Sequence, residues 1–350
     1  MEKKLSLKKL IYSSNIGIIV DDGKNAGSGH LVRTLNLADQ LISKKNKIYF
    51  MTSHQRINFS KKNKINILIN KYKKINFDYI KKIIIKNKIK ILIVDSYKIK
   101  EDIQKKFKQL VKVLILFSDM VKSKNVADVL INNNFVNSKE IQIIKKRNLS
   151  SFYILGPRNI LLNKSYLKYK KKILLRKKIN KIFVFFGNSE PKKLTLNILK
   201  ILIKFNKIKV VCIIGKYSKN KNIIKSFCIK QSIKYFINIK NTKMMKIMIG
   251  SDLAIGSAGV NLIERIFLGL PSIIISTANN QLSNAINFNK KKLVIYAGHF
   301  NGNYQNNTEN ILNKLIKNKK FYNYYSKKNF MFYKNNDFFK LKSSLTNIII

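Results

Sequence analysis

The chain has 350 residues, of which 45% are hydrophobic and 11% aromatic, enough for a sizeable core and, at roughly 100–200 residues per domain, for two domains. Its formal net charge is +55 at pH 7. Two cysteines exclude a disulfide framework, and no Cys/His spacing indicates a metal site. No apolar run approaches the ~18–20 residues of a membrane span, and residues 1–10 lead into no secretory-signal pattern, so we expect a cytoplasmic protein.

The positive charge, taken alone, indicates a nucleic acid or an anionic membrane surface as partner. However, the residues in excess are Lys, Ile and Asn, whose codons are all A/T-rich, and the lysines occur along the whole chain rather than in one arginine-rich patch. We therefore expect no specific nucleic-acid partner and no obligate protein partner. A peripheral contact with an anionic membrane stays open, and the charge also attracts an anionic substrate.

The first part of the chain alternates short apolar runs, which predict strands, with amphipathic stretches, which predict helices. The strands are expected at 15–20, 47–51, 65–69, 89–94, 113–117 and 129–131, and the helices at 30–43, 76–88 and 100–109. This alternation is typical of βαβ units and a parallel sheet.

A second series follows the Gly156-Pro157 turn and the lysine-rich stretch 164–181. It predicts strands at 181–186, 208–214, 234–237, 253–255, 272–276 and 293–296, and helices at 192–205, 222–230, 242–249, 260–268 and 281–289. The tail from Phe321 is expected to be helical. The sequence thus predicts two doubly wound, Rossmann-like α/β domains, residues 1–160 and residues 161–350 with the tail. We expect the carboxyl edges of their sheets, where such folds bind ligands, to face each other across a cleft.

A glycine-rich segment, Asp21–Arg33, links the first strand to the first helix. Gly27 and Gly29 allow the backbone to approach a ligand closely, and the helix that starts near His30 offers N–H groups and a positive dipole end to an anion. The imidazole of His30 can take a proton from water or a hydroxyl, and Asp21 at the strand end can orient it. The alternative is a tight strand-to-helix turn with an exposed histidine.

A second loop of small residues, Gly256-Ser257-Ala258-Gly259, precedes the helix from Val260. Its N–H groups can cradle a diphosphate at the helix N-terminus. Glu264, one turn into that helix, can accept hydrogen bonds from ribose hydroxyls; the alternative is a solvated carboxylate favoured by the helix dipole. Asn280 and Gln281 follow the next strand and can hydrogen-bond sugar hydroxyls or acetamido groups, although Asn is common throughout the chain.

Taken in order, these segments resemble the UDP-sugar hydrolases of pseudaminic acid biosynthesis, which are related in fold to the GT-B glycosyltransferases. The matches to that family's motifs span roughly residues 15 to 300: Asp21; Gly27-Ser28-Gly29-His30-Leu31-Val32-Arg33; Leu155-Gly156-Pro157; Gly187–Pro191 with Leu194-Thr195; Gly256–Gly259 with Glu264-Arg265; Leu268–Pro271; and Asn280-Gln281. The chain departs from the family at Ala258, Val260, Asn188 and Glu190, which we expect to affect the choice of substrate more than the fold.

The resemblance implies hydrolysis of UDP-2,4-diacetamido-2,4,6-trideoxy-β-L-altropyranose to UDP and the free sugar, by attack of water at the anomeric carbon, without a metal or cofactor. His30 would be the general base and Asp21 its orienting group, while the loop Gly256, Ser257, Ala258 and Gly259 would hold the diphosphate and Glu264 the ribose. The residues expected to contact the rest of the substrate are Gly27, Gly29, Arg33, Asn280 and Gln281, and Arg33 could equally be structural. The alternative function is a nucleotide-sugar-dependent glycosyltransferase of the same fold, which passes the sugar to an acceptor.

Overall fold

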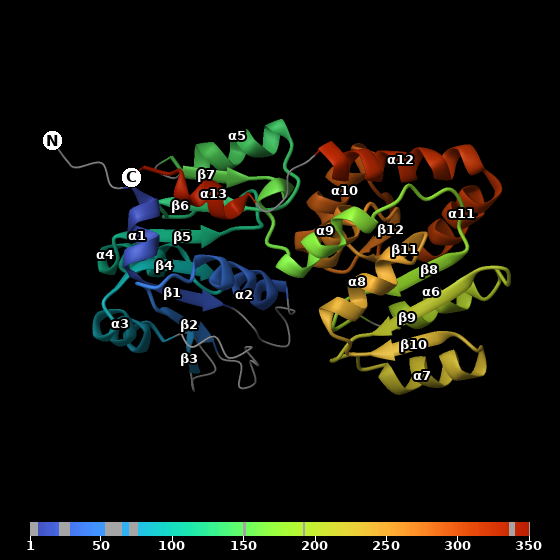
Figure 1. Cartoon of the computed structure of the whole chain (residues 1–350), viewed down its shortest axis with the longest axis horizontal. Coiled ribbons are helices and arrows are strands. Elements are labelled where there is room, and N and C mark those ends of the chain that lie inside the picture. The colour runs from blue at the N-terminus through green and yellow to red at the C-terminus, as the bar shows by residue number, and fades with distance from the viewer. Residues whose placement is uncertain are drawn as a thin grey trace. The chain divides into compact units, whose positions relative to one another are not determined.

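The computed structural model describes residues 6–20, 29–52, 65–69, 76–149, 152–191, 193–335 and 340–349. The chain divides into two compact units: the first comprises Met1–Leu162 with Phe338–Ile350, and the second comprises Asn163–Asp337. Each unit is an α/β structure built on one sheet, and Figure 1 shows helices on both faces of each sheet. Among the described residues, no helix is long and apolar enough to cross a membrane.

The first sheet has seven strands in the order β3-β2-β1-β4-β5-β6-β7, and all neighbouring strands pair in parallel. Their bounds are β1 Asn15–Val20, β2 Ile48–Thr52, β3 Ile65–Ile69, β4 Ile89–Asp95, β5 Val113–Phe117, β6 Val129–Asn132 and β7 Phe152–Leu155. The chain adds strands on one side of β1 up to β3 and then crosses to the other side with β4. The gap between β1 and β4 is therefore a topological switch point, where ligands bind in folds of this kind.

Two apolar layers cover the faces of the first sheet, because successive side chains of a strand point to opposite faces. One layer contains Ile16, Ile18 and Val20 of β1, and the other contains Ile19 of the same strand. The helices of this unit are α1 Leu7–Ser13, α2 Gly29–Leu41, α3 Phe77–Lys86, α4 Glu101–Leu110, α5 Ser138–Arg147 and α13 Leu341–Thr346, with a 3-10 turn at Pro157–Asn159.

The C-terminal segment belongs to the first unit, so our assignment of the whole tail to the second domain was wrong. Leu341 and Leu345 of α13 are fully buried in the same core as Leu7 and Ile11 of α1. The backbone N–H of Leu7 also donates to the carbonyl of Ile348 over 3.0 Å. A short apolar helix can cover any exposed core, and the local pattern of the tail does not say which one it covers.

The second sheet has six parallel strands in the order β10-β9-β8-β11-β12-β13, with its switch point between β8 and β11. The strands are β8 Lys181–Phe185, β9 Lys209–Ile214, β10 Lys234–Ile237, β11 Leu253–Ser257, β12 Ser272–Ser276 and β13 Ile295–His299. The helices are α6 Leu194–Leu202, α7 Lys221–Lys230, α8 Asn241–Ile249, α9 Val260–Phe267, α10 Leu282–Lys290, α11 Tyr304–Lys317 and α12 Lys319–Asn335, with 3-10 segments at Lys164–Lys172 and Asn279–Gln281. Two doubly wound α/β units therefore confirm the predicted fold class.

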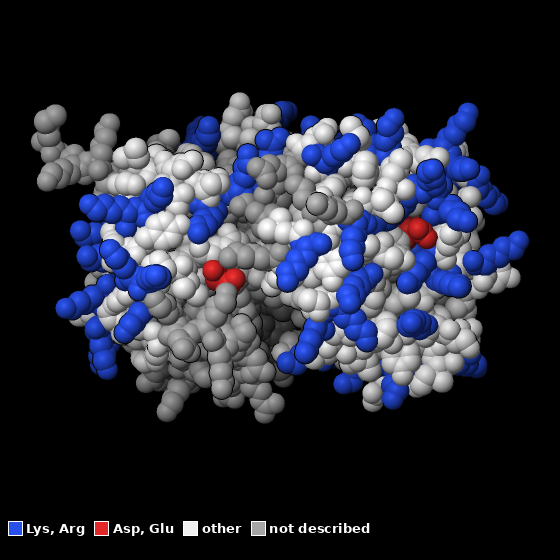
Figure 2. Space-filling view, viewed as in Figure 1, with Lys and Arg blue, Asp and Glu red and all other residues white. Residues whose placement is uncertain are grey.

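The cationic side chains are distributed over the visible surface rather than gathered in one region (Figure 2). Few acidic side chains interrupt them on that face, in keeping with 71 Lys and Arg residues against 16 Asp and Glu. On the face shown, the positive charge is therefore not concentrated over one element, and a binding site has to be sought in the particular positions of a few side chains.

Candidate functional site

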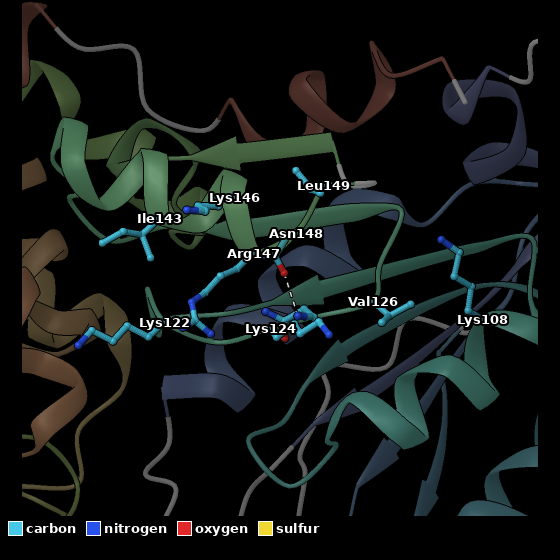
Figure 3. A pocket seen from close by; sticks show the side chains of 10 residues that line it. Lys108, Lys122, Lys124, Val126, Ile143, Lys146, Arg147, Asn148 and Leu149 are labelled. Atoms are coloured by element: carbon cyan, nitrogen blue, oxygen red, sulfur yellow. Dashed lines mark hydrogen bonds between the residues drawn. The ribbon is translucent and has the colours of Figure 1, made fainter.

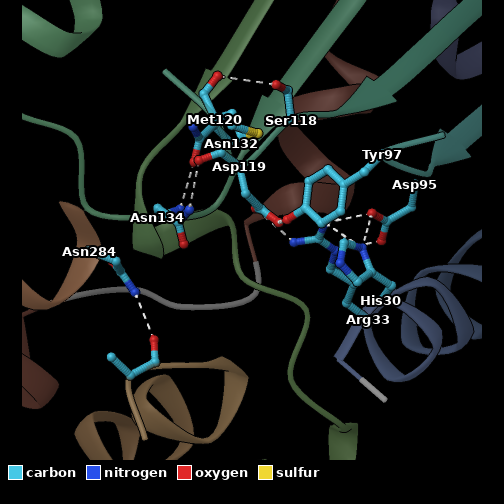
Figure 4. Close-up of polar contacts among 11 residues, drawn as sticks. His30, Arg33, Asp95, Tyr97, Ser118, Asp119, Met120, Asn132, Asn134 and Asn284 are labelled. Atoms are coloured by element: carbon cyan, nitrogen blue, oxygen red, sulfur yellow. Dashed lines mark hydrogen bonds and ion pairs between the residues drawn. The ribbon is translucent and has the colours of Figure 1, made fainter. Parts of the chain in front are cut away.

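A cluster of five polar or aromatic side chains lies at the carboxyl edge of the first sheet (Figure 4). This His30 cluster consists of His30 and Arg33 from the first turns of α2, Asp95 at the end of β4, Tyr97 just after it, and Asp119 two residues after β5. Because β1, β4 and β5 are neighbours and parallel, the segments that follow them meet at one edge of the sheet. The cluster thus occupies the switch point of the first unit.

Asp95 is the centre of the cluster and is only 1% exposed. Its Oδ1 lies 2.6 Å from Nδ1 of His30, and Arg33 donates to both carboxylate oxygens, from Nε and from Nη2, each over 2.5 Å. A buried carboxylate needs such compensation, and a two-pronged Arg–carboxylate contact is among the strongest available. The cationic fork of Arg33 therefore holds the Asp95 side chain in one orientation.

The contacts of His30 favour one tautomer of its ring. Arg33 donates to both oxygens of Asp95, so this carboxylate serves as a hydrogen-bond acceptor. Nδ1 of His30 lies 2.6 Å from Oδ1 of Asp95 and 3.2 Å from Nη2 of Arg33, and the much shorter contact with the carboxylate favours the tautomer with the proton on Nδ1. In that tautomer the lone pair is on Nε2, which has no hydrogen-bond partner among the described residues.

Asp119 forms the second anionic position of the cluster. It accepts hydrogen bonds from Nη1 of Arg33 and from the hydroxyl of Tyr97, each over 2.9 Å. Burial raises the pKa of Asp119, but the charge and hydrogen bond of Arg33 outweigh it, so the net pKa lies below the usual value. The Tyr97 ring also meets the His30 ring edge to face, with centroids 4.8 Å apart, which fixes the plane of the imidazole.

Arg33 contacts two carboxylates and stacks on the Phe117 ring, 4.9 Å from its centroid. Burial lowers the pKa of Arg33, but Asp119 and Asp95 raise it well above its ordinary value, so the side chain stays charged. Of the two roles left open by the sequence, these contacts support the structural one, since they engage all three nitrogens of the guanidinium.

The structure places some of the predicted residues and adds others. His30 is buried, with an exposed fraction of 6%, so the alternative of an exposed histidine does not hold. Asp21 and Gly27 lie outside the described residues, and Gly29 is the first residue of α2. The carboxylate that the structure places on His30 is Asp95. Its sequence signal was an acidic residue at the end of a buried strand, and Asp119 follows the next strand in the same way.

In the second unit, the predicted Gly256 and Ser257 are the last residues of β11, and Ala258 and Gly259 link this strand to α9; we call these four residues the second-unit loop. A Cβ atom on Gly256 would lie 2.3 Å from the Phe185 carbonyl oxygen and 2.0 Å from Nη1 of Arg265, so only glycine fits there. Gly259 precedes α9 without a side-chain cap. A helix start that lacks a side-chain cap leaves N–H groups that can bind an anion.

Arg265 lies beneath this loop and is fully buried. Its Nη2 donates to the Ser257 carbonyl over 2.5 Å, whereas Nε and Nη1 have no hydrogen-bond partner within the described part of the chain. Burial lowers the pKa of Arg265 to about 10, against the opposing effect of Glu264. The guanidinium is therefore charged at neutral pH, and an anion on the loop would be attracted to it.

Glu264 is buried rather than solvated, with an exposed fraction of 7%. Burial raises its pKa, and hydrogen bonds from the Asn261 amide and the Tyr166 hydroxyl oppose that rise. Two donors thus hold the carboxylate on the inner side of α9. A ribose hydroxyl would have to share these oxygens with them.

The segment after β12 meets the same loop. Gln281 accepts hydrogen bonds at Oε1 from the backbone and hydroxyl of Thr277, and its Nε2 lies 3.6 Å from where a Cβ of Gly259 would be. The buried Asn284, which we did not predict, donates to the Ala258 carbonyl over 3.4 Å. Asn280 is exposed within the 3-10 turn Asn279–Gln281. The amide of Gln281 is therefore the predicted group that lies next to the loop.

Comparisons with known proteins agree with this architecture. No known family model matches the chain. An uncharacterized protein of Methanocaldococcus jannaschii, MJ1062, is 31% identical over 275 residues, which cover 74% of the chain and 55% of that protein. The spore coat polysaccharide biosynthesis protein SpsG of Bacillus subtilis is 25% identical over 136 residues, 38% of the chain and 40% of that protein. The chain thus spans about half the length of these relatives.

Solved structures with a similar fold cover nearly the whole chain. UGT2 of Phytolacca americana, complexed with UDP-2fluoro-glucose and pterostilbene, superposes with a TM-score of 0.66 at 12% identity, over 96% of this chain and 99% of that one. MurG of Acinetobacter baumannii gives a TM-score of 0.64 at 12% identity over the same shares. These likenesses show the fold: the chain is an α/β protein of two Rossmann-like units, as are the GT-B glycosyltransferases.

The two glycines of the second-unit loop should respond differently to the same substitution. Gly256→Ala should lower the free energy of unfolding by about 1–3 kcal/mol, because its Cβ meets a backbone oxygen at 2.3 Å. Gly259→Ala should change stability by less than about 0.5 kcal/mol, since its nearest neighbours lie at 3.6 and 3.9 Å. Urea unfolding of both variants measures this difference, and equal losses would contradict the packing described for Gly256.

The lowered pKa of Asp119 predicts a pH dependence of stability. The folded pKa lies below the ordinary 3.8, so the ionised group stabilises the fold above that pH, and this stabilisation is lost as the pH falls through the folded pKa. Asp119→Asn should therefore destabilise the protein most at neutral pH, and the difference from wild type should shrink in acid. Urea unfolding between pH 7 and 3 tests this, with the exposed Asp102→Asn as control. A difference that stays constant with pH would contradict the assignment.

Proposed function

We propose that this protein processes a nucleotide sugar in glycan biosynthesis. The observation that carries the proposal is the His30–Asp95 pair at the switch point of a Rossmann-like sheet, in which Asp95 contacts Nδ1 and leaves Nε2 to act as a proton acceptor. The name of SpsG, a polysaccharide biosynthesis protein, supports the same class of substrate. So does the bound UDP-2fluoro-glucose of the structurally similar UGT2.

The finer proposal is hydrolysis of UDP-2,4-diacetamido-2,4,6-trideoxy-β-L-altropyranose to UDP and the free sugar. It is supported by the ordered series of motifs that resembles the UDP-sugar hydrolases of pseudaminic acid biosynthesis. In this proposal Nε2 of His30 takes a proton from water as the water oxygen attacks the anomeric carbon and the bond to the diphosphate breaks. General-base catalysis of this kind typically accelerates a reaction by a factor of roughly 10²–10⁴.

Asp95 has two tasks in this mechanism. Its hydrogen bond to Nδ1 keeps the lone pair on Nε2 before the reaction, and its negative charge stabilises the imidazolium that forms once the proton has moved. Arg33 holds the Asp95 carboxylate in place through two hydrogen bonds. Asp119, bound to the same guanidinium, adds a further negative charge to the cluster.

In this proposal the nucleotide part of the substrate binds to the second unit. The N–H groups at the start of α9 would bind the diphosphate, and the buried charge of Arg265 would stabilise it as the leaving group gains negative charge. Glu264 would accept a hydrogen bond from the ribose, and Gln281 would offer its Nε2 to a phosphate or sugar oxygen. UDP then leaves with the electron pair of the broken bond.

The test is to incubate the purified protein with this UDP-sugar, with chelator and without any acceptor, and to follow UDP and the free sugar by proton NMR. Release of both supports the hydrolase. Saturable UDP binding without release would reject the hydrolysis of this substrate. The protein would then be proposed as a glycosyltransferase, or as a hydrolase of another UDP-sugar. Absence of UDP binding would reject nucleotide-sugar processing altogether.

Substitution of His30 tests its role as base. His30→Ala should keep UDP affinity and lower turnover at least roughly tenfold, the low side of the general-base range. His30→Gln is the matched variant, because its amide can still donate to Asp95 but takes no proton from water. Turnover of the purified variants under saturating substrate measures both. Wild-type turnover in His30→Gln would show that the side chain only maintains the cluster.

A further inference from the structure

A pocket of about 760 Å³ opens on the first unit, and ten residues line it (Figure 3). They come from the end of α4, the segment before β6, and the end of α5: Lys108, Lys122, Lys124, Asn125, Val126, Ile143, Lys146, Arg147, Asn148 and Leu149. Its volume lies within the roughly 300–1,000 Å³ typical of small-molecule sites. None of these residues has a role in the proposed function.

This basic pocket is distinct from the His30 cluster. The segments that carry Lys108, Val126 and Arg147 lead into β5, β6 and β7, so these residues approach the amino edge of the sheet, whereas Asp95 and Asp119 lie at the carboxyl edge. Lys122, three residues after Asp119, lies on the segment that runs from the carboxyl edge towards the amino edge. The pocket shares no lining residue with the His30 cluster, so a ligand there would occupy a second site of the same unit.

Two buried amides hold the wall of the basic pocket. Gln104 of α4 accepts a hydrogen bond from the backbone of Val126 over 2.9 Å. Asn148, just after α5, accepts one from the backbone of Asn125 over 2.8 Å and donates to the Ile144 carbonyl over 2.7 Å. The exposed fractions of Gln104 and Asn148 are 5% and 3%. The loop before β6 is thus hydrogen-bonded to residues of α4 and of the segment after α5, and these bonds hold the wall of the pocket in a defined position.

Five cations line the basic pocket, and only two have an acidic partner. Lys108 pairs with Asp128 over 3.2 Å, and Lys124 pairs with Glu101 over 3.4 Å. Within the described residues, no carboxylate forms an ion pair with the other three, Lys122, Lys146 and Arg147. Three like charges around one cavity repel each other, and an anion of two or three negative charges would offset this repulsion.

The basic pocket also presents apolar side chains. Val126 and Ile143 line it, and Leu149 at its rim is 87% exposed, the largest exposure among the large hydrophobic residues of the described chain. An inorganic anion would leave these side chains in water. A ligand that carries both a phosphate and an apolar part would use the whole lining, because the cations bind the phosphate and the aliphatic groups bury the apolar part.

We propose that the basic pocket binds a phosphate ester with an apolar substituent. The phosphate would be bound by Lys122, Lys146 and Arg147, and the apolar part would lie on Ile143 and Leu149. The same chemistry occurs in the head group and first chain carbons of an anionic lipid and in a soluble phosphate ester, so the experiment distinguishes the two sources.

The probe is dihexanoyl phosphatidic acid at concentrations where it is monomeric, titrated calorimetrically into the full chain at 150 mM salt. The pocket variant Lys122→Gln/Lys146→Gln/Arg147→Gln should bind it at least roughly tenfold more weakly, since three phosphate ligands are lost. The matched control Lys207→Gln/Lys225→Gln/Lys230→Gln removes the same charge from exposed positions of the second unit and should bind within twofold of wild type. Leu149→Ser should weaken the probe but leave the affinity for inorganic pyrophosphate unchanged.

Equal loss in the pocket and control variants would overturn the proposal, because binding would then follow net charge alone. Absence of saturable binding to the wild type would overturn it as well. Flotation with vesicles of phosphatidylcholine and phosphatidic acid separates the sources. Vesicle binding that depends on the three pocket cations supports a membrane lipid, and monomer binding without it supports a soluble phosphate ester. These readouts do not involve turnover, so they stand whatever the outcome for the proposed function.

Discussion

In each unit, every strand of the sheet pairs in parallel, and this constraint places all carboxyl ends at one edge. The chain leaves each carboxyl end through a loop, and at the switch point two such loops diverge to opposite faces. His30 follows β1 and Asp95 ends β4, so the pair that carries the proposed chemistry exists because these two strands are neighbours. The second-unit loop, Gly256–Gly259, occupies the corresponding place at the carboxyl end of β11.

The buried charges of the two units are compensated in different ways. In the first unit, the carboxylates of Asp95 and Asp119 share the guanidinium of Arg33, so the protein itself satisfies the cluster. In the second unit, Arg265 has a carbonyl partner and a neighbouring Glu264, but two of its nitrogens are unsatisfied in the described structure. Buried polar groups without partners are costly and therefore rare. An anion on the loop above Arg265 would offset part of that cost, which agrees with the assignment of the nucleotide to this unit.

The packing of the second unit requires glycine at one of the two glycine positions of the second-unit loop. Gly256 lies between the Phe185 carbonyl of the neighbouring strand and the guanidinium of Arg265, where no side chain fits. Gly259 has space around it, and a substituent there would instead meet the Gln281 amide. The first glycine is thus required by the packing of the fold, whereas the second keeps the start of α9 open.

The sequence by itself determined the periodic elements and the loops that follow the strands. It predicted the strands of both sheets except β7, and the switch-point segment 256–259 of the second unit. The first switch-point loop lies outside the described residues apart from its end at Gly29, and the roles of His30 and Glu264 as site residues stay predictions. It missed α1, α5 and α11, although the capping box of α5, formed by Asn137 and Glu140, is visible in the sequence as Asn-x-x-Glu. Short-range patterns of this kind are readable because they depend only on residues a few positions apart.

Only the tertiary structure decided which side chains meet. Asp95 lies 65 residues from His30, and Asp119 lies 86 residues from Arg33, so their contacts depend on the order of strands in the sheet, which no local pattern encodes. The same holds for α13, whose two buried leucines complete the core of the first unit after the chain has traversed the second. Local hydrophobic periodicity fixes which face of an element is buried, but the partner of that face is chosen by packing across the whole chain.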